Sequence, residues 1–371
     1  MKVEREIAGF TLPFAAGILL ISLAGNHFFS SHHVWASASL GACSVMLMHC
    51  IHPSRKNIGT IGRAFLIGGL ALCLGIFCGE CGKTLSVSSL DSGLLIHAER
   101  YGKLLQTAVD SIPFSDSQTN AVIKALLTGE KADIPPSVTA AFRDSGASHI
   151  LALSGFHLGI IYGIVRALLS VLGNRRKTLI LRAAATIAAC GFYTMATGAG
   201  PSIVRAFLFI TLHETASLSH RYHSTGSILL AALFIQLVIS PESVTSVGFQ
   251  LSYAAMAGIA FIFPWLKGLW PGNPYKDKGF TKGVRWVWNS AAMSISCQVT
   301  TGPLAWICFH SFPQHFLLTN LIVLPLASMV IPSALATLTL HSLGLCPSLL
   351  LKGTELLVST MITALEIIAT M

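Results

Sequence analysis

Polar side chains that could do chemistry collect between residues 142 and 159, at the start of an apolar run. The stretch reads FRDSGASHILALSGFHLG and contains His149, Ser154 and His157. Residues three apart share one face of a helix, and polar groups at membrane depth usually face the protein interior or line a pathway. Gly155 and Gly159 form a G-x-x-x-G pattern, which permits close approach of a second helix. The residues alone leave two readings open: a hydrogen-bonded packing seam, or a polar functional site.

Two kinds of catalytic site that such side chains could form do not fit the spacing of the residues in the sequence. A nucleophilic Ser154 with His157 as its base needs a third group to orient the imidazole, and neighbours on one helix rarely achieve this. A metal centre would use Glu214, but the sequence has His213 directly before it and lacks the H-E-x-x-H spacing. The other histidines weighed for such a centre are His149, His220 and His223. We therefore expect no enzymatic activity, no cofactor and no metal.

The composition shows what must position these side chains. Of 371 residues, 53% are hydrophobic and 11% are charged, whereas an ordinary soluble domain has about 25% charged residues. Apolar residues fall in long blocks bounded by charged loops, which is typical of a multi-pass membrane protein and excludes a soluble single-domain enzyme. The net charge of +9 is assigned mainly to cationic loops retained in the cytoplasm, with a nucleic-acid partner as the sharper alternative.

The apolar blocks predict an all-α, polytopic helical bundle with about eleven membrane spans (ten to twelve), some of them broken. Interruptions are expected at Gly302-Pro303 and in the span that holds Asn320, Pro325 and Pro332. The expected spans are 8–27, 34–51, 61–79, 149–172, 178–197, 201–218, 225–240, 247–266, 287–308, 316–341 and 345–368.

Charge in the loops predicts the orientation. With the N-terminus in the cytoplasm, Lys and Arg collect in alternate loops, as the positive-inside rule requires. We expect three segments: N-terminal transmembrane helices in 1–79, a short extracytoplasmic segment in 80–148, and a second set of transmembrane helices in 149–371. The middle segment shows helical patterns at Leu94–Ile112, which is amphipathic, and at Ser117–Leu127, preceded by an Asp116/Ser117 cap signal. These helices are expected to lie along the membrane or pack on the bundle, with a partner-binding face as the alternative.

Cysteine usage offers one further motif. Of the nine Cys residues, Cys78 and Cys81 form a C-x-x-C pair, which suggests a redox pair or a disulfide at a membrane surface. The other seven lie in apolar stretches, where Cys behaves as a small hydrophobe.

Four local motifs, in order, resemble the signature of the ComEC competence family, the polytopic channel proteins of bacterial natural transformation. The first runs from ALLTG at 125–129 through FRDSG at 142–146 into HILALSGFH at 149–157. The second is GAGPSIVRA at 198–206, the third is SVGFQLSY at 246–253, and the fourth is TNLIVLP at 319–325. The resemblance covers about residues 110 to 340.

The resemblance implies an inner-membrane channel that carries single-stranded DNA into a bacterial cell. The residues it assigns to the DNA path are His149, Ser154, His157, Arg205, Gln250, Ser252 and Asn320, with Gly155 and Gly159 in helix packing. Implied partners are single-stranded DNA and the lipid bilayer. It leaves open a DNA receptor, a cytoplasmic ATP-driven translocase, a separately encoded nuclease and further copies of the chain.

Arg205 has a physical reason to meet DNA. Gly198 to Pro201 should end one helix and start the next, and Pro201 is a favoured first-turn residue. The N-terminus of the new helix would present free N–H groups and a positive dipole end, with the Arg205 guanidinium one turn further in. The alternatives are that Arg205 snorkels or pairs with Glu214 or a backbone carbonyl. Packing likewise remains an alternative for Gln250, Ser252 and Asn320.

The chain also departs from many family members. The interval after Glu80 is too short for their OB-like domain, and no His-x-His-x-Asp-His cluster of a metallo-β-lactamase-like domain is present. A truncated, split or degenerate member is therefore one expectation. A secondary transporter of a small solute is the alternative of another class, although it would show broken helices in two related halves, and no such symmetry is seen.

Overall fold

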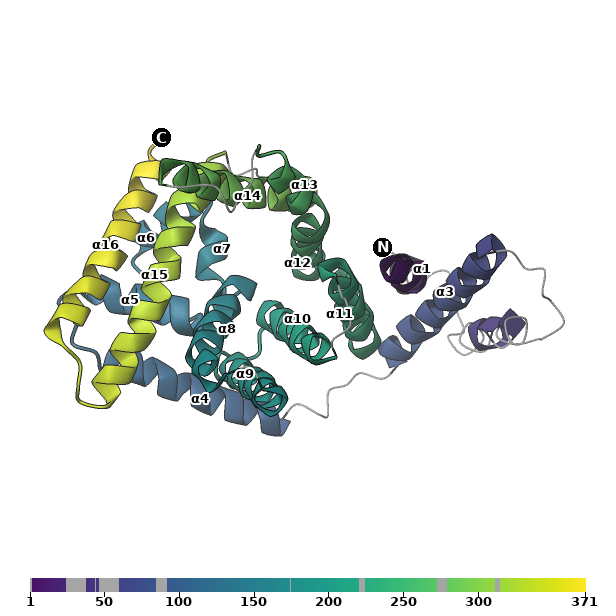
Figure 1. Ribbon diagram of the computed structural model, residues 1–371, viewed down its shortest axis with the longest axis horizontal. Helices are drawn as coiled ribbons and strands as arrows, with labels where there is room; N and C mark the ends of the chain where they lie inside the picture. The colour runs from purple at the N-terminus through teal and green to yellow at the C-terminus, as the bar shows by residue number, and fades with distance from the viewer. Residues whose placement is uncertain are drawn as a thin grey trace. The chain divides into compact units, whose positions relative to one another are not determined.

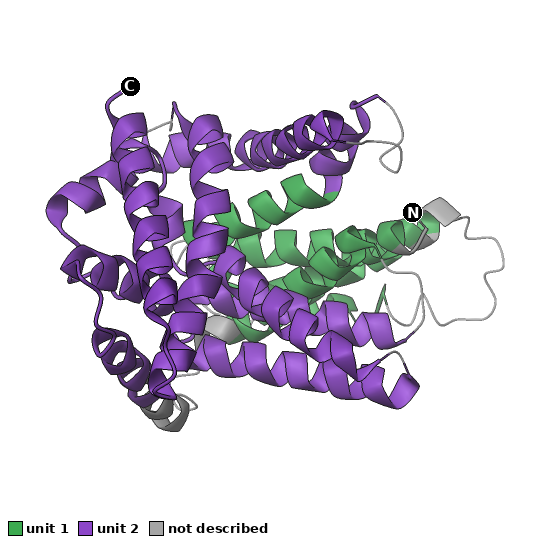
Figure 2. Ribbon diagram, turned by 60° about the vertical axis from the view of Figure 1, so that its left-hand side comes forward, with its two compact units in different colours: residues 1–89, 221–260 green, residues 90–220, 261–371 purple. Residues whose placement is uncertain are grey.

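The computed structural model describes residues 2–24, 38–43, 45–46, 60–84, 92–173, 175–219, 224–271, 279–310 and 314–371. Every regular element in these ranges is helical (Figure 1). The chain forms two compact units (Figure 2): unit 1 comprises residues 1–89 and 221–260, and unit 2 comprises 90–220 and 261–371. The predicted all-α membrane fold is confirmed. The three-segment division predicted along the chain stays a prediction, because the units group residues by contact.

Unit 1 is held by close packing of two apolar helices. Its elements are α1 (Lys2–Ala24), α3 (Thr60–Thr84), α11 (Thr225–Ile239), the 3-10 turn η2 (Pro241–Thr245) and α12 (Val247–Ala257). A β-carbon at Gly17 would lie 2.2 Å from the Leu72 carbonyl oxygen, and one at Gly75 would lie 2.0 Å from that of Phe14. Only glycine permits this backbone contact between α1 and α3, which is how helices associate in lipid.

Unit 2 contains the first, second and fourth sequence motifs. Its elements are α4 (Ser92–Asp110), α5 (Ser117–Thr128), α6 (Pro136–Asp144), α7 (Ser148–Leu151), α8 (Gly155–Leu169), η1 (Ser170–Leu172), α9 (Arg176–Ala196), α10 (Pro201–Leu218), α13 (Phe263–Gly268), α14 (Phe280–Phe309), α15 (Phe316–Ser342) and α16 (Ser348–Ala369). One apolar core joins α5 and α6 to α15 and α16, and a second joins α8, α9 and α10. The π-helical turn η3 (Gly258–Ile262) connects α12 to α13.

The helices of the predicted middle segment are confirmed, and they pack on the bundle. Asp116 caps α5 by accepting a hydrogen bond from the Gln118 N–H at 3.0 Å. α5 is buried along nearly its whole length, and it packs against α4, α15 and α16. It forms part of the core of unit 2 because its apolar residues cover most of its circumference.

Seven described helices are long and apolar enough to cross a membrane: 4–23, 64–81, 155–172, 176–196, 247–268, 316–342 and 348–369. Each matches one of the expected spans. α10 and α14 are helical as expected but more polar, and α11 is apolar but shorter, at 15 residues. The expected span at 34–51 lies largely outside the described residues.

The expected positions of the helix breaks are partly wrong. A continuous helix was expected from His149, but α7 ends at Leu151 and α8 begins at Gly155. Ala152 and Ser154 between them have extended backbones. In contrast, α15 runs unbroken through Pro325 and Pro332, and α14 runs through Pro303. Neighbouring packing therefore retains the helix at these prolines, whereas a capping serine interrupts it near residue 154.

Candidate functional site

The break before α8 is a capping box built from the motif itself. The Ser154 Oγ accepts a hydrogen bond from the Phe156 N–H at 3.3 Å, and the Ser154 N–H donates to Nδ1 of His157 at 3.3 Å. Ser154 is thus the N-cap and His157 is the third helical residue. The Ser154 side chain accepts from the backbone of the first turn, and the His157 side chain accepts from the Ser154 backbone N–H. The sequence-based view of the two as neighbours within one continuous helix is corrected: they define where the helix starts.

The His157 ring has one nitrogen that is not used in the capping box. The side chain is fully buried, and its Nε2 has no hydrogen-bond partner among the described residues. Since Nδ1 accepts from Ser154, a neutral imidazole carries its proton on Nε2, which is then a buried donor. The Nδ1 of His149 is 3.2 Å from the Gly146 carbonyl oxygen.

The first and second motifs meet between α8 and α10. A β-carbon added at Gly155 would lie 3.4 Å from the β-carbon of Ala206. Further along both helices, Glu214 Oε1 accepts hydrogen bonds from the Tyr162 hydroxyl at 2.6 Å and from the Arg166 guanidinium at 2.7 Å. Because residue numbers rise together on both helices, α8 and α10 run parallel, and their N-termini lie at the same end.

Arg205 sits at this shared end and is nearly fully buried. Its Nη2 donates to the Ser202 hydroxyl at 2.9 Å, which holds the guanidinium toward the first turn of α10. Glu214 is nine residues further on, or about 13.5 Å along a helix, and it is paired with Arg166 instead. The alternative in which Arg205 pairs with Glu214 is therefore wrong.

The first motif also meets the fourth. The Thr319 hydroxyl, fully buried at the start of α15, donates to the Ser145 carbonyl oxygen at 2.6 Å. Asn320 follows, and its Oδ1 is buried with no hydrogen-bond partner in the described part of the chain. Gly129 closes α5 with a left-handed φ of 81°, and a β-carbon there would lie 2.8 Å from Leu153. Segments far apart in sequence thus converge around residues 145–155.

The third motif lies in unit 1. The Gln250 side-chain amide donates to the Val244 carbonyl oxygen at 2.9 Å, and this bond ties α12 to η2. The Tyr253 hydroxyl donates to Gln236 Oε1 at 2.9 Å. Ser252 is partly exposed on α12. Gln250 therefore has a bracing contact, and a role of Gln250 and Ser252 in a DNA path stays a prediction.

Three further predictions concern packing and sulfur chemistry. Gly155 meets α10, as expected for close packing, whereas a β-carbon at Gly159 would meet nothing within 4 Å. The predicted packing role of Gly159 therefore finds no close partner among the described residues. Cys78 and Cys81 are thiols one turn apart in α3, and the Cys78 Sγ lies 3.9 Å from the carbonyl oxygens of Leu237 and Val238. Their pairing as a disulfide stays a prediction.

Sequence reasoning did not single out Tyr162 and Arg166, although both lie in a predicted span. The Arg166 guanidinium carbon is 5.8 Å from the centre of the Tyr162 ring, and the Glu214 side chain that they share is 3% exposed. A charged residue inside an apolar helix was the available signal. Its importance appears only when α10 supplies the opposite charge.

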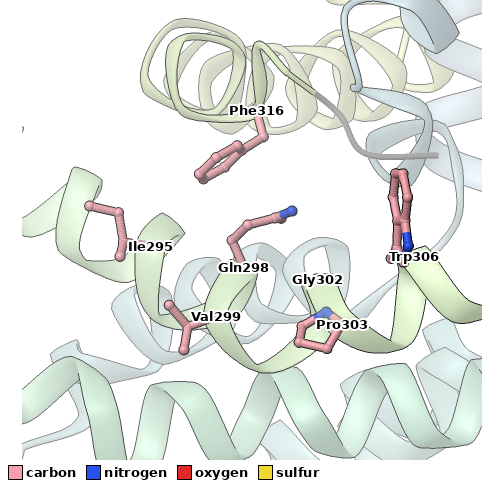
Figure 3. Close-up of a pocket in the computed structure, with 7 residues that line it drawn as sticks. All are labelled: Ile295, Gln298, Val299, Gly302, Pro303, Trp306 and Phe316. Atoms are coloured by element: carbon pink, nitrogen blue, oxygen red, sulfur yellow. The ribbon is translucent and has the colours of Figure 1, made fainter. Parts of the chain in front are cut away.

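An open groove of about 540 Å³ lies between α14 and α15. Figure 3 shows Phe316 from α15 facing α14 side chains, including Gln298 and Pro303. Its lining is almost wholly apolar and consists of Ile295, Gln298, Val299, Gly302, Pro303, Trp306 and Phe316. None of the predicted path residues lines this groove.

A family model described as Competence protein matches residues 126–371. The chain belongs to the competence protein family. The match includes all four motifs apart from Ala125, so the resemblance seen in the sequence is confirmed. The family segment therefore contains the convergence around residues 145–155 and both polar ends of the α8–α10 pair.

Curated relatives are distant but cover much of the chain. It is 25% identical over 277 residues to the protein YcaI of Escherichia coli, covering 73% of this chain and 35% of that protein. It is 26% identical over 249 residues to ComE operon protein 3 of Bacillus subtilis, covering 65% and 30%. It is 25% identical over 282 residues to competence protein ComA of Neisseria gonorrhoeae, covering 74% and 35%. The chain thus spans about a third of the length of these relatives. No solved structure matches it.

Proposed function

We propose that this competence-family chain forms a passage for single-stranded DNA that enters a bacterial cell across its inner membrane during natural transformation. The family match over residues 126–371 carries the proposal and supports a role in DNA uptake. The apolar helices support a multi-pass membrane protein. The N-terminus is taken as cytoplasmic because Lys and Arg collect in alternate loops.

The polar end of the α8–α10 pair is the proposed entry point. Two parallel helices begin there, so their positive dipole ends add to the charge of Arg205 and favour a phosphate backbone. α8 is capped by its own side chains, but α10 begins at Pro201 without a side-chain cap. A guanidinium can contact phosphate in bidentate fashion, and the buried His157 donor could add a further hydrogen bond. This arrangement suits a charged strand that is recognised without regard to sequence.

The proposed partners follow from the direction of transport. DNA must be delivered from outside, so a DNA receptor is proposed there, and an ATP-driven translocase in the cytoplasm would supply pull. A separately encoded nuclease would remove the second strand, and further copies of the chain would complete the passage if one copy does not enclose it.

The test is transformation of a naturally competent strain that lacks this gene and any homologue. Complementation with the wild-type chain should restore transformants, whereas Arg205→Ala should lower their number at least tenfold at equal membrane abundance. Arg176→Ala, which removes an exposed cation from the start of α9, is the matched control and should restore fully. Normal transformation in the deletion strain would overturn the proposal and favour a small-solute transporter, whose solute should raise the thermal stability of the purified chain.

A further inference from the structure

A second group of unusual side chains lies on α13, on the two residues that follow it, and on the first turns of α14. Four of the six Trp residues in the chain fall here, at positions 265, 270, 286 and 288. Between residues 261 and 300 the sequence contains one acid, Asp277, and five cations: Lys267, Lys276, Lys278, Lys282 and Arg285. Retention of cations in the cytoplasm explains the Lys and Arg residues but not the Trp residues.

The structure packs half of these Trp residues and exposes the other half. Trp270 and Trp288 lie with ring centres 6.1 Å apart, and the Trp288 Nε1–H donates to the Leu266 carbonyl oxygen at 3.2 Å. The hydrogen bond to Leu266 ties α14 to α13. Trp265 and Trp286 point outward and are 65% and 52% exposed. Large apolar neighbours are exposed with them, including Leu269 and Phe280.

Cations are placed beside the rings. The Arg285 guanidinium carbon lies 5.9 Å from the centre of the Trp270 ring, and the Lys267 Nζ lies 5.9 Å from that of Phe263. Lys282 is exposed four residues before Trp286, so the two share a face of α14. The surface therefore interleaves apolar rings with positive charge.

The position of this surface along the chain indicates what covers it. The candidate span 247–268 ends in α13, so the exposed rings lie where a membrane helix reaches water. Trp residues are enriched at this depth, and Lys and Arg next to it attract anionic phospholipid headgroups. Exposed aliphatic side chains such as Leu269 fit acyl chains better than they fit nucleic-acid bases.

We propose that α13 and the start of α14 form a binding site for anionic phospholipid at the cytoplasmic membrane surface. Lys267, Lys282 and Arg285 contact the headgroup phosphate, and Trp265 and Trp286 insert between the acyl chains. The site goes beyond DNA passage, and its test does not depend on DNA uptake.

The test is native mass spectrometry of the full chain released from nanodiscs that contain phosphatidylcholine and phosphatidylglycerol. Wild type should retain phosphatidylglycerol in preference, and Lys267→Gln/Lys282→Gln should reduce the retained lipid at least threefold. Arg176→Gln/Lys177→Gln removes two exposed cations from the start of α9 and is the matched control. Equal retention in wild type and both variants would overturn the site.

A second measurement keeps the proposal testable if the charge variant is unstable. With Trp35→Phe and Trp306→Phe, fluorescence comes only from the four Trp residues at positions 265–288. Brominated phosphatidylglycerol should quench it more strongly than brominated phosphatidylcholine does. Equal quenching by the two brominated lipids would overturn the proposal. An oligonucleotide that binds the chain in nanodiscs of uncharged lipid, and no longer binds the Lys267→Gln/Lys282→Gln variant, would assign the surface to another ligand and also overturn it.

Discussion

At the residue scale, Gly129 shows how one position can hold the family segment together. Its φ of 81° is rarely adopted by L side chains, and a β-carbon there would lie 2.8 Å from Leu153. Glycine tolerates this backbone angle and this close approach because it has no side chain. Alanine at position 129 would therefore strain the backbone and displace Leu153. Leu153 precedes the Ser154 cap of α8, which places this contact next to the proposed entry point.

We therefore expect Gly129→Ala to lower the free energy of unfolding by about 2 kcal/mol or more, of which about 1 kcal/mol is backbone strain. Thermal unfolding in detergent measures the change. Gly173→Ala is the control, because Gly173 has a φ of 77° but open space around it, so only the strain should appear. Equal losses at the two positions would show that the contact with Leu153 contributes nothing.

Lys124 is a second residue whose surroundings set its effect. Its Nζ lies 2.6 Å from Asp110 Oδ1 and 2.7 Å from Asp133 Oδ2. Burial by itself would lower the pKa of Lys124, but the hydrogen bonds and charges of the two aspartates outweigh burial and raise it. The stabilisation is then complete below the unfolded-state pKa of about 10.4 and is lost only as the pH rises through the higher folded-state value.

Lys124→Met should therefore destabilise the chain by about 1–3 kcal/mol at neutral pH. The deficit relative to wild type should stay constant from about pH 7 to about pH 9, because Lys124 stays protonated in both the folded and the unfolded wild-type chain over this range. Urea unfolding at several pH values checks this. A deficit that vanishes by pH 9 would mean that the lysine is neutral in the fold.

At the scale of elements, the parallel pairing of α8 with α10 is the feature that the sequence could not reveal. The second motif predicted a helix start at Pro201, and the first was expected to continue a helix from His149, but nothing in a single sequence states which two helices touch. If Gly155 and Ala206 face each other as their 3.4 Å approach indicates, cysteines there have β-carbons close enough for a disulfide. In a background without other cysteines, Gly155→Cys/Ala206→Cys should cross-link on mild oxidation, whereas Gly159→Cys/Ala206→Cys should not. Cross-linking of both pairs alike would contradict this register.

The Arg166–Glu214 pair predicts an asymmetry between its two partners. The Glu214 side chain is 3% exposed and that of Arg166 is 41% exposed. Arg166→Met leaves a buried carboxylate with only the Tyr162 hydroxyl, whereas Glu214→Leu leaves a cation that can still reach water or headgroups. Arg166→Met should therefore cost more thermal stability than Glu214→Leu, and the double variant should cost less than Arg166→Met alone. A larger loss for Glu214→Leu would contradict this prediction, because the unpaired Arg166 would then cost more stability than the unpaired Glu214.

Much of the element pattern was readable in advance for physical reasons. Long apolar blocks and proline or capping signals at Asp116 and Pro201 predicted helix positions well, because these signals act locally. The break at Ser154 was not foreseen, since it depends on the His157 side chain turning back onto the Ser154 backbone. The burial of α5 and the partner of Glu214 depend on contacts between distant segments, which a periodic pattern does not encode.

At the scale of the whole molecule, three of the four family motifs lie in unit 2. The proposed entry point for DNA lies in the same unit. The first motif touches the second through Gly155 and Ala206, and the fourth through Ser145 and Thr319. We therefore expect an incoming strand to pass the shared N-terminal end of α8 and α10. The alternatives of a solute transporter or an inactive family member predict no DNA at that end.

The most direct test of this claim is site-specific photo-cross-linking during uptake of labelled DNA in competent cells. A photoreactive residue at Ser202, whose hydroxyl contacts Arg205, should become attached to the labelled strand while uptake proceeds. The same probe at Leu349, which is 82% exposed on α16, is the control and should stay unattached. Labelling at Leu349 but not at Ser202, or at neither position while uptake continues through this chain, would show that the strand does not pass the N-terminal end of α8 and α10.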